Sequence, residues 1–201
     1  ARQHNLTRVS NANGVRQTYT YDVISGNAYL KDIEVPGGNR VSFVYASGSP
    51  TSLLNYVQDW SGRRWTLQYD VSRRLTTFTT PLGCSTKYSY ASFRSNIFLS
   101  QIEDPRGYQT QYQYDSQRRV TTMVAGSATW AWSHVAGRTV MASPSGALTT
   151  YQFDASGNLI METMPEGYPV NYRYDTGRRP TQILMPYGAT TSVVYDNLGR
   201  I

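Results

Sequence analysis

Residues 165–179 read Pro-Glu-Gly-Tyr-Pro-Val-Asn-Tyr-Arg-Tyr-Asp-Thr-Gly-Arg-Arg, and the features of this stretch recur along the whole chain. Its centre is the motif Tyr-x-Tyr-Asp at residues 172–175. The second aromatic residue of this motif recurs at positions 21, 45, 69, 90, 114, 132, 153, 174 and 195. Nine copies therefore follow one another with an average spacing of about 22 residues, which predicts an array of small, similar units.

A glycine at a fixed offset confirms the register of this repeat. It lies seven residues before the second aromatic residue in every copy except the one at Trp132, which has Ala125 there. The glycines are Gly14, Gly38, Gly62, Gly83, Gly107, Gly146, Gly167 and Gly188. Several of them end the tripeptide Pro-x-Gly, in which proline presets φ and glycine tolerates a positive φ. We therefore expect a turn at each glycine.

The residues between two such turns predict two strands. Residues 108–115, Tyr-Gln-Thr-Gln-Tyr-Gln-Tyr-Asp, alternate with the period of two that is typical of a half-buried strand. A second strand follows the aspartate, and its apolar residues lie three apart, as in Leu30/Ile33 and Leu75/Phe78. This spacing predicts a β-bulge, because plain alternation does not produce it.

Each unit is thus predicted to be a β-hairpin. We expect residues 1–201 to form a single array of about nine hairpins in one coiled antiparallel sheet, with the all-β architecture of a spiral, shell or solenoid. Stacked hairpins would bury a common aromatic face and align their tyrosines in cross-strand ladders. Replacing Tyr114 or Tyr174 by alanine should then destabilise the fold by several kcal/mol.

Composition excludes several classes of protein. The chain has 201 residues, and no stretch approaches the ~18–20 uninterrupted apolar residues of a membrane-spanning helix. Its first five residues lack the apolar segment of a secretory signal. The single cysteine, Cys84, excludes an internal disulfide. The formal net charge of +6 comes almost wholly from arginine, since Lys31 and Lys87 are the only lysines.

Enzyme and metal chemistry have little local support. The two histidines are His4 and His134, and no His-x-x-x-His, Cys-x-x-Cys or Gly-x-Ser-x-Gly motif is present. We therefore assign no catalytic, cofactor-binding or metal-ligating residue, although a cluster around His134 or Cys84 would support an enzyme.

The recurring aspartates are interpreted as turn formers. They would bond nearby backbone N–H groups or the arginine that follows. Calcium binding is the alternative, with only one carboxylate in each turn. The residues concerned are Asp22, Asp70, Asp115, Asp154, Asp175 and Asp196.

Four arginine pairs invite a nucleic-acid interpretation, which we consider the weaker one. They are Arg63-Arg64, Arg73-Arg74, Arg118-Arg119 and Arg178-Arg179. Three of these pairs follow Tyr-x-Tyr closely, where an aspartate can pair with them. Arginine also stacks on tyrosine, so the scarcity of lysine favours structural arginines over a phosphate-binding patch. The aromatic rows could also form a sugar-stacking surface, which would be favoured if Trp60, Trp65, Trp130 and Trp132 were exposed in a row.

These motifs resemble the RHS repeat, also called the YD repeat, with the signature Gly-x-x-x-x-Tyr-x-Tyr-Asp-x-x-Gly-Arg-Leu. The best copies are residues 167–178, 146–159 and 188–200. The family includes bacterial Rhs polymorphic toxins, the C component of Tc toxin complexes and the animal teneurins. The resemblance implies a β-sheet that spirals into a hollow shell, which encloses a toxin segment in the toxins and serves as an extracellular scaffold in teneurins.

The resemblance also sets the functional expectation. We expect a non-catalytic structural module, a fragment of a longer array or a small member of the family, that scaffolds or encapsulates a toxin or partner segment. Its partners would be neighbouring repeats, an enclosed toxin domain, or a cell-surface glycan or protein, but no nucleic acid and no cofactor. The alternative is an adhesion module that binds glycans or proteins. The location implied is secreted or cell surface.

The sequence also contains a tetrapeptide similar to the self-cleavage segment of toxin-bearing family members. Toxin-bearing members end the array with an Asp-Pro-x-Gly segment linked to self-cleavage. Residues 104–107 read Asp-Pro-Arg-Gly, but they lie in mid-array at an ordinary turn position. We therefore interpret them as a turn.

Overall fold

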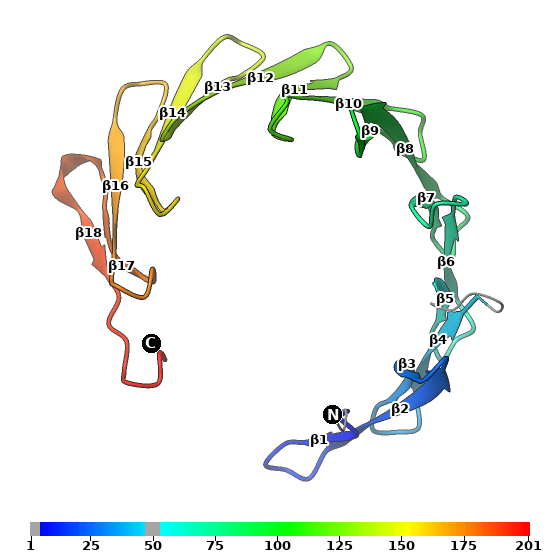
Figure 1. Cartoon of the computed structure of the whole chain (residues 1–201). Helices are drawn as coiled ribbons and strands as arrows, with labels where there is room; N and C mark the ends of the chain where they lie inside the picture. Colours follow the sequence, from blue (N-terminus) through cyan, green and yellow to red (C-terminus); the bar gives the residue numbers. More distant parts are fainter. Residues whose placement is uncertain (1–4, 47–52) are drawn as a thin grey trace. The chain divides into compact units, whose positions relative to one another are not determined.

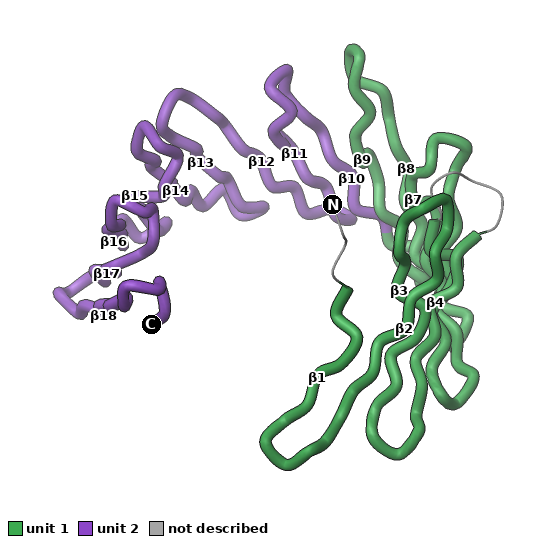
Figure 2. Tube along the Cα trace, turned by 60° about the horizontal axis from the view of Figure 1, so that its bottom comes forward, with its two compact units in different colours: residues 1–108 green, residues 109–201 purple. Residues whose placement is uncertain are grey.

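The computed structural model describes residues 5–46 and 53–201, so the predicted candidate His4 lies outside the described residues. The chain divides into two compact units, Ala1–Tyr108 and Gln109–Ile201, which are coloured separately in Figure 2. Both consist of strands that follow one another along the chain (Figure 1).

The described residues of the first unit form strands β1 to β9. Their bounds are β1 Arg8–Ser10, β2 Arg16–Ile24, β3 Asn27–Glu34, β4 Arg40–Tyr45, β5 Leu54–Gln58, β6 Arg64–Tyr69, β7 Leu75–Thr79, β8 Ser85–Phe93 and β9 Asn96–Glu103. Every strand pairs antiparallel with the next one in sequence, which makes a meander.

The second unit repeats this plan with strands β10 to β18. Their bounds are β10 Gln109–Tyr114, β11 Val120–Ala125, β12 Ala128–Val135, β13 Arg138–Ala142, β14 Leu148–Phe153, β15 Leu159–Thr163, β16 Pro169–Tyr174, β17 Pro180–Leu184 and β18 Thr190–Ser192, with a 3-10 turn, η1, at Pro186–Gly188. Consecutive strands again pair antiparallel. The predicted all-β array of hairpins is confirmed.

Most hairpin loops share one backbone conformation. The N–H of the first residue donates to the carbonyl of the fifth, and the N–H of the fourth donates to the carbonyl of the first. The fourth residue has a positive φ, as in three-residue hairpin loops with a glycine bulge. We call the loops at one end of the strands glycine loops: 11–15, 35–39, 59–63, 80–84, 104–108, 143–147, 164–168 and 185–189. Those at the other end are aspartate loops: 70–74, 115–119, 154–158, 175–179 and 196–200.

The glycine loops confirm the predicted role of the repeated glycine. Each of the eight glycines, from Gly14 to Gly188, has φ between 75° and 89°. An L-residue in this region costs ~1–2 kcal/mol, because its Cβ approaches the following carbonyl oxygen. The backbone therefore requires glycine there, although a Cβ built on Gly107 would meet nothing within 4 Å.

The predicted β-bulge is also confirmed. In hairpin β2–β3, Tyr21 lies opposite Leu30 while Thr20 lies opposite Asp32, so Lys31 is the extra residue. Leu30 and Ile33 consequently share the face of the tyrosines in spite of their spacing. The same shift occurs in hairpins β4–β5, β6–β7, β8–β9, β10–β11, β14–β15 and β16–β17.

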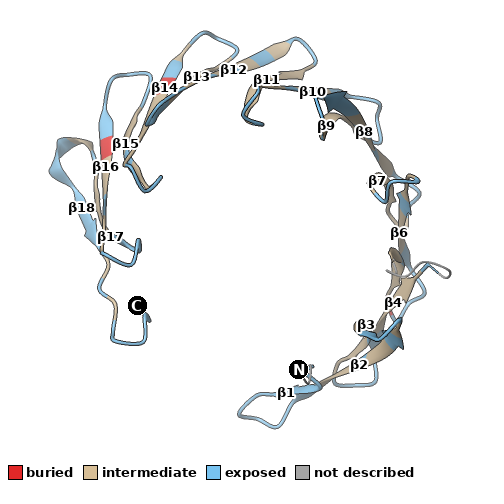
Figure 3. Ribbon diagram, viewed as in Figure 1, coloured by how far each residue is buried: buried red, intermediate tan, exposed pale blue. Residues whose placement is uncertain are grey.

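The aromatic face is less buried than expected. Among the described residues Val170 is the one buried hydrophobic residue, at 6% exposure, and Figure 3 shows most strand positions as intermediate. The reason is that each unit is a sheet without a second layer on the aromatic face. The predicted tyrosine ladder is also wrong in detail, because within a hairpin most repeat tyrosines lie opposite an aliphatic residue, as in Tyr19 opposite Ile33, although the rings of Tyr29 and Tyr45 on adjacent strands are 5.1 Å apart.

Candidate functional site

The aspartate loops carry a repeated polar cluster. In loop 70–74, Asp70 Oδ1 accepts hydrogen bonds from the N–H groups of Ser72 and Arg74, both at 2.9 Å. Its Oδ2 accepts from Arg74 Nε at 2.6 Å. The Arg74 N–H is the largest influence on this carboxyl and lowers its pKa, and the guanidinium adds to the effect. The carboxylate thus closes the loop and fixes an arginine.

The same arrangement recurs where the repeat recurs. Aspartate pairs with the arginine four residues later in Asp115–Arg119, Asp175–Arg179 and Asp196–Arg200, at 2.7 Å in each case. In the loop that begins at Asp154, Asn158 stands in place of the arginine, and its Nδ2 donates to Asp154 Oδ2 at 2.8 Å. The interpretation of these aspartates as turn formers is confirmed.

Asp22 is the exception, and the prediction for it was wrong. It lies within β2 and pairs with Lys31 at 3.1 Å. This hairpin continues to a two-residue turn at Ser25-Gly26, because Val23 and Ile24 extend the strand beyond the usual place.

The first arginine of each pair has a role that the sequence interpretation missed. Arg73, Arg118 and Arg178 occupy the fourth position of their loops, with φ between 62° and 69°. Arg178 also reaches the preceding aspartate loop, where it donates to Asn158 Oδ1 at 3.0 Å and to the Ser156 carbonyl at 2.6 Å. The arginine pairs therefore serve the loops. The pair Arg63-Arg64 belongs instead to a glycine loop, where Arg63 pairs with Asp59 at 2.6 Å.

In five repeats the hydroxyl of the second tyrosine donates to a backbone carbonyl fifteen residues earlier. Tyr90 donates from its hydroxyl to the carbonyl of Leu75, the first residue of the preceding bulged strand, at 2.9 Å. A bulge interrupts the ladder of backbone hydrogen bonds, so a side-chain donor there stabilises the strand. The same bond is made by Tyr21, Tyr45, Tyr174 and Tyr195, each to the residue fifteen positions earlier.

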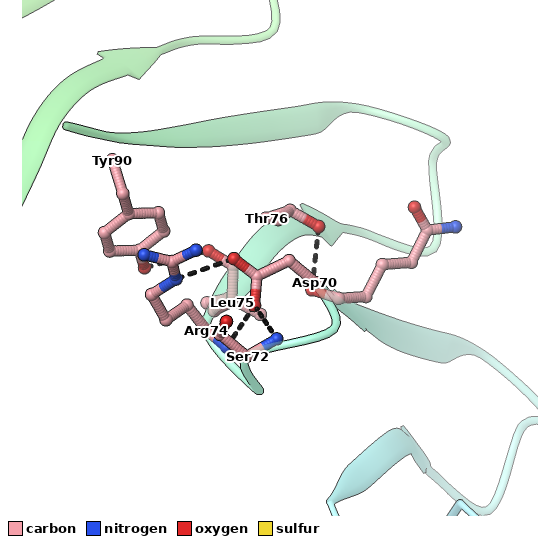
Figure 4. Close-up of polar contacts among 7 residues, drawn as sticks. Asp70, Ser72, Arg74, Leu75, Thr76 and Tyr90 are labelled. Atoms are coloured by element: carbon pink, nitrogen blue, oxygen red, sulfur yellow. Dashed lines mark hydrogen bonds and ion pairs between the residues drawn. The ribbon is translucent and has the colours of Figure 1, made fainter. Parts of the chain in front are cut away.

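These contacts combine into a clasp, shown in Figure 4 for Asp70, Arg74, Leu75 and Tyr90. The Arg74 guanidinium lies 5.2 Å from the ring centroid of Tyr90 while it is held by Asp70. One arginine thus contacts the carboxylate of its own hairpin and the tyrosine of the next. A second clasp has the same four positions, Asp175, Arg179, Pro180 and Tyr195, with Arg179 at 4.6 Å from the ring. The predicted stacking of arginine on tyrosine is confirmed.

The degenerate repeat lacks both the bulge and the tyrosine that caps it. Hairpin β12–β13 has no register shift, whereas the seven hairpins β2–β3, β4–β5, β6–β7, β8–β9, β10–β11, β14–β15 and β16–β17 each have one. The following repeat has Phe153, which lacks a hydroxyl, in place of the second tyrosine. Instead, the Phe153 N–H donates to the Gly137 carbonyl at 2.8 Å. A tyrosine is therefore replaced where no bulge precedes it.

His134 takes the tyrosine's place within this degenerate repeat. Its Nε2 lies 2.8 Å from the carbonyl of Val120, the first residue of the preceding bulged strand. Its Nδ1 lies 3.0 Å from Thr139 Oγ1. Both ring nitrogens are thus engaged in structural contacts, and His134 caps the bulge as a tyrosine does elsewhere.

The remaining candidates lie apart from any catalytic arrangement. Cys84 is the exposed last residue of a glycine loop. Within residues 5–46 and 53–201 no three His, Cys, Asp or Glu side chains are grouped as metal ligands would be. Residues 104–108 form an ordinary glycine loop, in which Asp104 Oδ1 accepts from the N–H groups of Arg106 and Tyr108.

The tryptophans do not form the exposed row that would indicate glycan binding. Trp60 is 56% exposed at the tip of a glycine loop. Trp65, Trp130 and Trp132 are half-buried in strands. No helix in the described part of the chain is long and apolar enough to cross a bilayer.

Comparison with known families now identifies the repeat. The RHS Repeat family model matches residues 99–129, which contain the complete hairpin β10–β11 and its aspartate loop. This part of the chain is an RHS repeat. The bulge of this matched hairpin recurs in hairpins β2–β3, β4–β5, β6–β7, β8–β9, β14–β15 and β16–β17, whereas hairpin β12–β13 lacks it. A search of curated proteins gives no match.

A solved structure of low sequence identity contains the same fold. The crystal structure of TcdB2-TccC3 without its hypervariable C-terminal region is 14% identical, with a TM-score of 0.52, and the match covers 95% of this chain and 15% of that one. The Photorhabdus luminescens Tc holotoxin pore with TccC3-D651A is 17% identical, with a TM-score of 0.46 over 91% of this chain and 10% of that one. The chain therefore spans less than a fifth of the length of these proteins.

Proposed function

We propose that residues 1–201 are one structural RHS-repeat array, a section of a β-sheet wall that scaffolds or encapsulates a toxin or partner segment without catalysis of its own. The observation that carries this proposal is the clasp. Its aspartate, arginine and tyrosine engage one another and the backbone, so the recurring polar side chains serve the continuity of the sheet. In a catalytic site such groups would face a substrate.

The comparisons support the same proposal at the level of the fold. TccC3 has a hypervariable C-terminal region, and a section of the TcdB2-TccC3 structure without that region matches the fold of this chain. By analogy, the array would be followed or filled by a variable polypeptide and would act outside the cell or at its surface. Neighbouring repeats of a longer polypeptide are its first partners, because a meander continues by adding strands.

Protease protection in the complete natural polypeptide tests the proposal. Segments next to the array should be cleaved slowly while the wall is intact. They should be cleaved rapidly when the hydroxyls of the two clasps are removed together in Tyr90→Phe/Tyr195→Phe. Cleavage of the neighbouring segments at the same rate in both proteins would contradict the proposed role.

Glycan or protein adhesion is the second candidate, and exposed Trp60 is the observation that favours it. A glycan array probed with the wild-type chain and with Trp60→Ala decides between the two. Binding that depends on Trp60 would favour adhesion, whereas the structural proposal expects no hit that this substitution removes.

A further inference from the structure

A glutamate stands on the aromatic face at a place where the other repeats are apolar. Glu162 is the third residue after the first position of the bulged strand β15. It lies opposite Tyr151 on β14 and Val170 on β16. The residues at the corresponding place in the other bulged hairpins are Ile33, Val57, Phe78, Ile102, Met123 and Ile183.

Two tyrosines contact or border this carboxylate. Tyr172 donates its hydroxyl proton to Glu162 Oε2 at 3.2 Å. Burial first, and then the charge of Glu162, raise the pKa of both Tyr151 and Tyr172. Glu162 is half-buried, and its cross-strand neighbour Val170 is the buried hydrophobic residue of the fold. The carboxylate is thus partly removed from water and has a neutral hydroxyl as its donor.

No cation of the described chain reaches it. Other glutamates on strands are paired with one: Glu34 with Arg40 at 3.4 Å and Glu103 with Lys87 at 2.8 Å. Within residues 5–46 and 53–201, no lysine or arginine nitrogen lies within 4.0 Å of Glu162.

The nearby arginines belong to the other side of the sheet. Arg138 pairs with Gln152, the neighbour of Tyr151, and Arg173 is the neighbour of Tyr172. Because successive residues of a strand alternate between faces, both arginines take the face opposite to Glu162.

The molecule itself shows what completes such a site. In each clasp an arginine lies between a carboxylate and a tyrosine ring, as Arg179 does between Asp175 and Tyr195. Glu162, Tyr151 and Tyr172 provide a carboxylate and tyrosines without the arginine. A guanidinium suits this gap, because it forms charge-assisted bonds with carboxylates and stacks on aromatic rings.

We propose that Glu162, Tyr151 and Tyr172 form a binding site for an arginine side chain of a polypeptide that lies on the aromatic face. This rests on the proposed function in one respect, since the polypeptide would be the enclosed or scaffolded segment. The charge of Glu162 favours a basic segment at this repeat. The apolar residues at the same place in the other hairpins provide no charge that would favour one.

An NMR titration of the whole chain with acetyl-Gly-Arg-Gly-amide tests the site. The backbone amide signals of residues 151, 162 and 172 should shift and saturate. The citrulline peptide, which has the same shape without the charge, should leave them unchanged. Glu162→Gln keeps an acceptor for Tyr172 and removes the charge, so it should weaken binding at least about fivefold. Glu166→Gln, an equal charge change in the neighbouring glycine loop, should change binding less than about twofold.

Two results would overturn the site: equal binding of the citrulline peptide, or unchanged affinity in Glu162→Gln. Glu162→Met introduces the residue that another repeat has at this place, so it keeps the fold testable if the glutamine variant is unstable. It should also lose binding. The outcome is separable from the proposed function, because the tripeptide tests the site alone and protease protection tests the wall.

Discussion

The fourth residue of the loop, which has a positive φ, is glycine in all eight described glycine loops, whereas in the five aspartate loops it is arginine in three and glycine in two. The two sets of loops otherwise share one hydrogen-bonding pattern. The first residue of every aspartate loop is an aspartate whose carboxylate accepts hydrogen bonds from backbone N–H groups of that loop. Several glycine loops begin instead with a residue that has no carboxylate: Val35, Thr80, Met164 or Met185. Glycine makes the conformation accessible without help, and an arginine there is accompanied by a carboxylate that holds the loop.

The ends also differ in what they connect. The register shifts occur in hairpins that close at the end of the aspartate loops, and the tyrosine and arginine contacts between hairpins lie beside them. The strand pairs that close at glycine loops run without a shift. The glycine loops therefore reverse the chain direction, whereas the end with the aspartate loops also provides the side-chain contacts between successive hairpins.

Acid should produce the largest difference between the two ends, because it acts on all aspartate loops together. The folded state lowers the pKa of Asp70, Asp115, Asp154, Asp175 and Asp196, chiefly through hydrogen bonds from the loop that follows each one. Their stabilisation is fully present above the unfolded pKa of about 3.9 and is lost as the pH falls through the lower folded values.

Thermal unfolding between pH 7 and pH 2 measures this effect. The melting temperature should stay level down to about pH 5 and then fall, since the aspartates bind protons more readily when unfolded. Asp115→Asn should reduce the slope of that fall. A melting temperature that rises on acidification would contradict the pairing.

Tyr174→Ala should have the largest effect of any single substitution. It removes a half-buried ring and the hydroxyl that caps Leu159, so the free energy of unfolding should fall by about 2–4 kcal/mol. Urea denaturation measures it. Tyr114→Ala should lower the free energy of unfolding by a similar amount. An unchanged urea midpoint in both variants would refute the stabilising role of the aromatic face.

Gly107→Ala tests the glycine loops. With φ at 84°, the substitution should destabilise the chain by about 1–2 kcal/mol, because the added Cβ is strained in this region whatever space surrounds it. Urea denaturation is again the measurement. Gly177→Ala in an aspartate loop is the control, since Gly177 has no positive φ and should cost less.

Tyr174→Phe isolates the hydrogen bond from the second tyrosine of a repeat to the preceding bulged strand. It should cost about 1 kcal/mol, because the Leu159 carbonyl loses its donor while the ring remains. Phe153→Tyr is the matched control at the repeat that follows a hairpin without a register shift, and its hydroxyl should add no comparable stability. If Phe153→Tyr stabilised the chain by as much as Tyr174→Phe destabilised it, the proposed capping of the bulge by the tyrosine hydroxyl would be contradicted.

Arg118→Gly should give the smallest effect, with the opposite sign. Relief of the positive φ of 69° should stabilise the chain by about 0.5 kcal/mol, offset in part by the greater backbone entropy of glycine in the unfolded state. A loss of stability as large as that of Gly107→Ala would show that the arginine side chain itself holds this loop.

Much of this fold could be predicted from the sequence because its determinants are local. Pro-x-Gly, the alternation of residues 108–115 and the spacing of Leu30 and Ile33 predicted the turns, strands and bulges that are observed. The error at Asp22 has the same origin, since the motif is present there but the strand runs on through Val23 and Ile24. Glu162 was overlooked although the repeat itself places it among apolar residues.

The sequence alone determined the hairpin period, the glycine positions and the pairing of aspartate with the arginine four residues later, because each depends on backbone geometry within one loop. Only the tertiary structure decided that Tyr90 caps Leu75, that His134 replaces a tyrosine and that Glu162 has no ion-pair partner among residues 5–46 and 53–201. These depend on strand register and on contacts between successive hairpins. A motif cannot show them, because the same residue meets different neighbours according to the hairpin that precedes it.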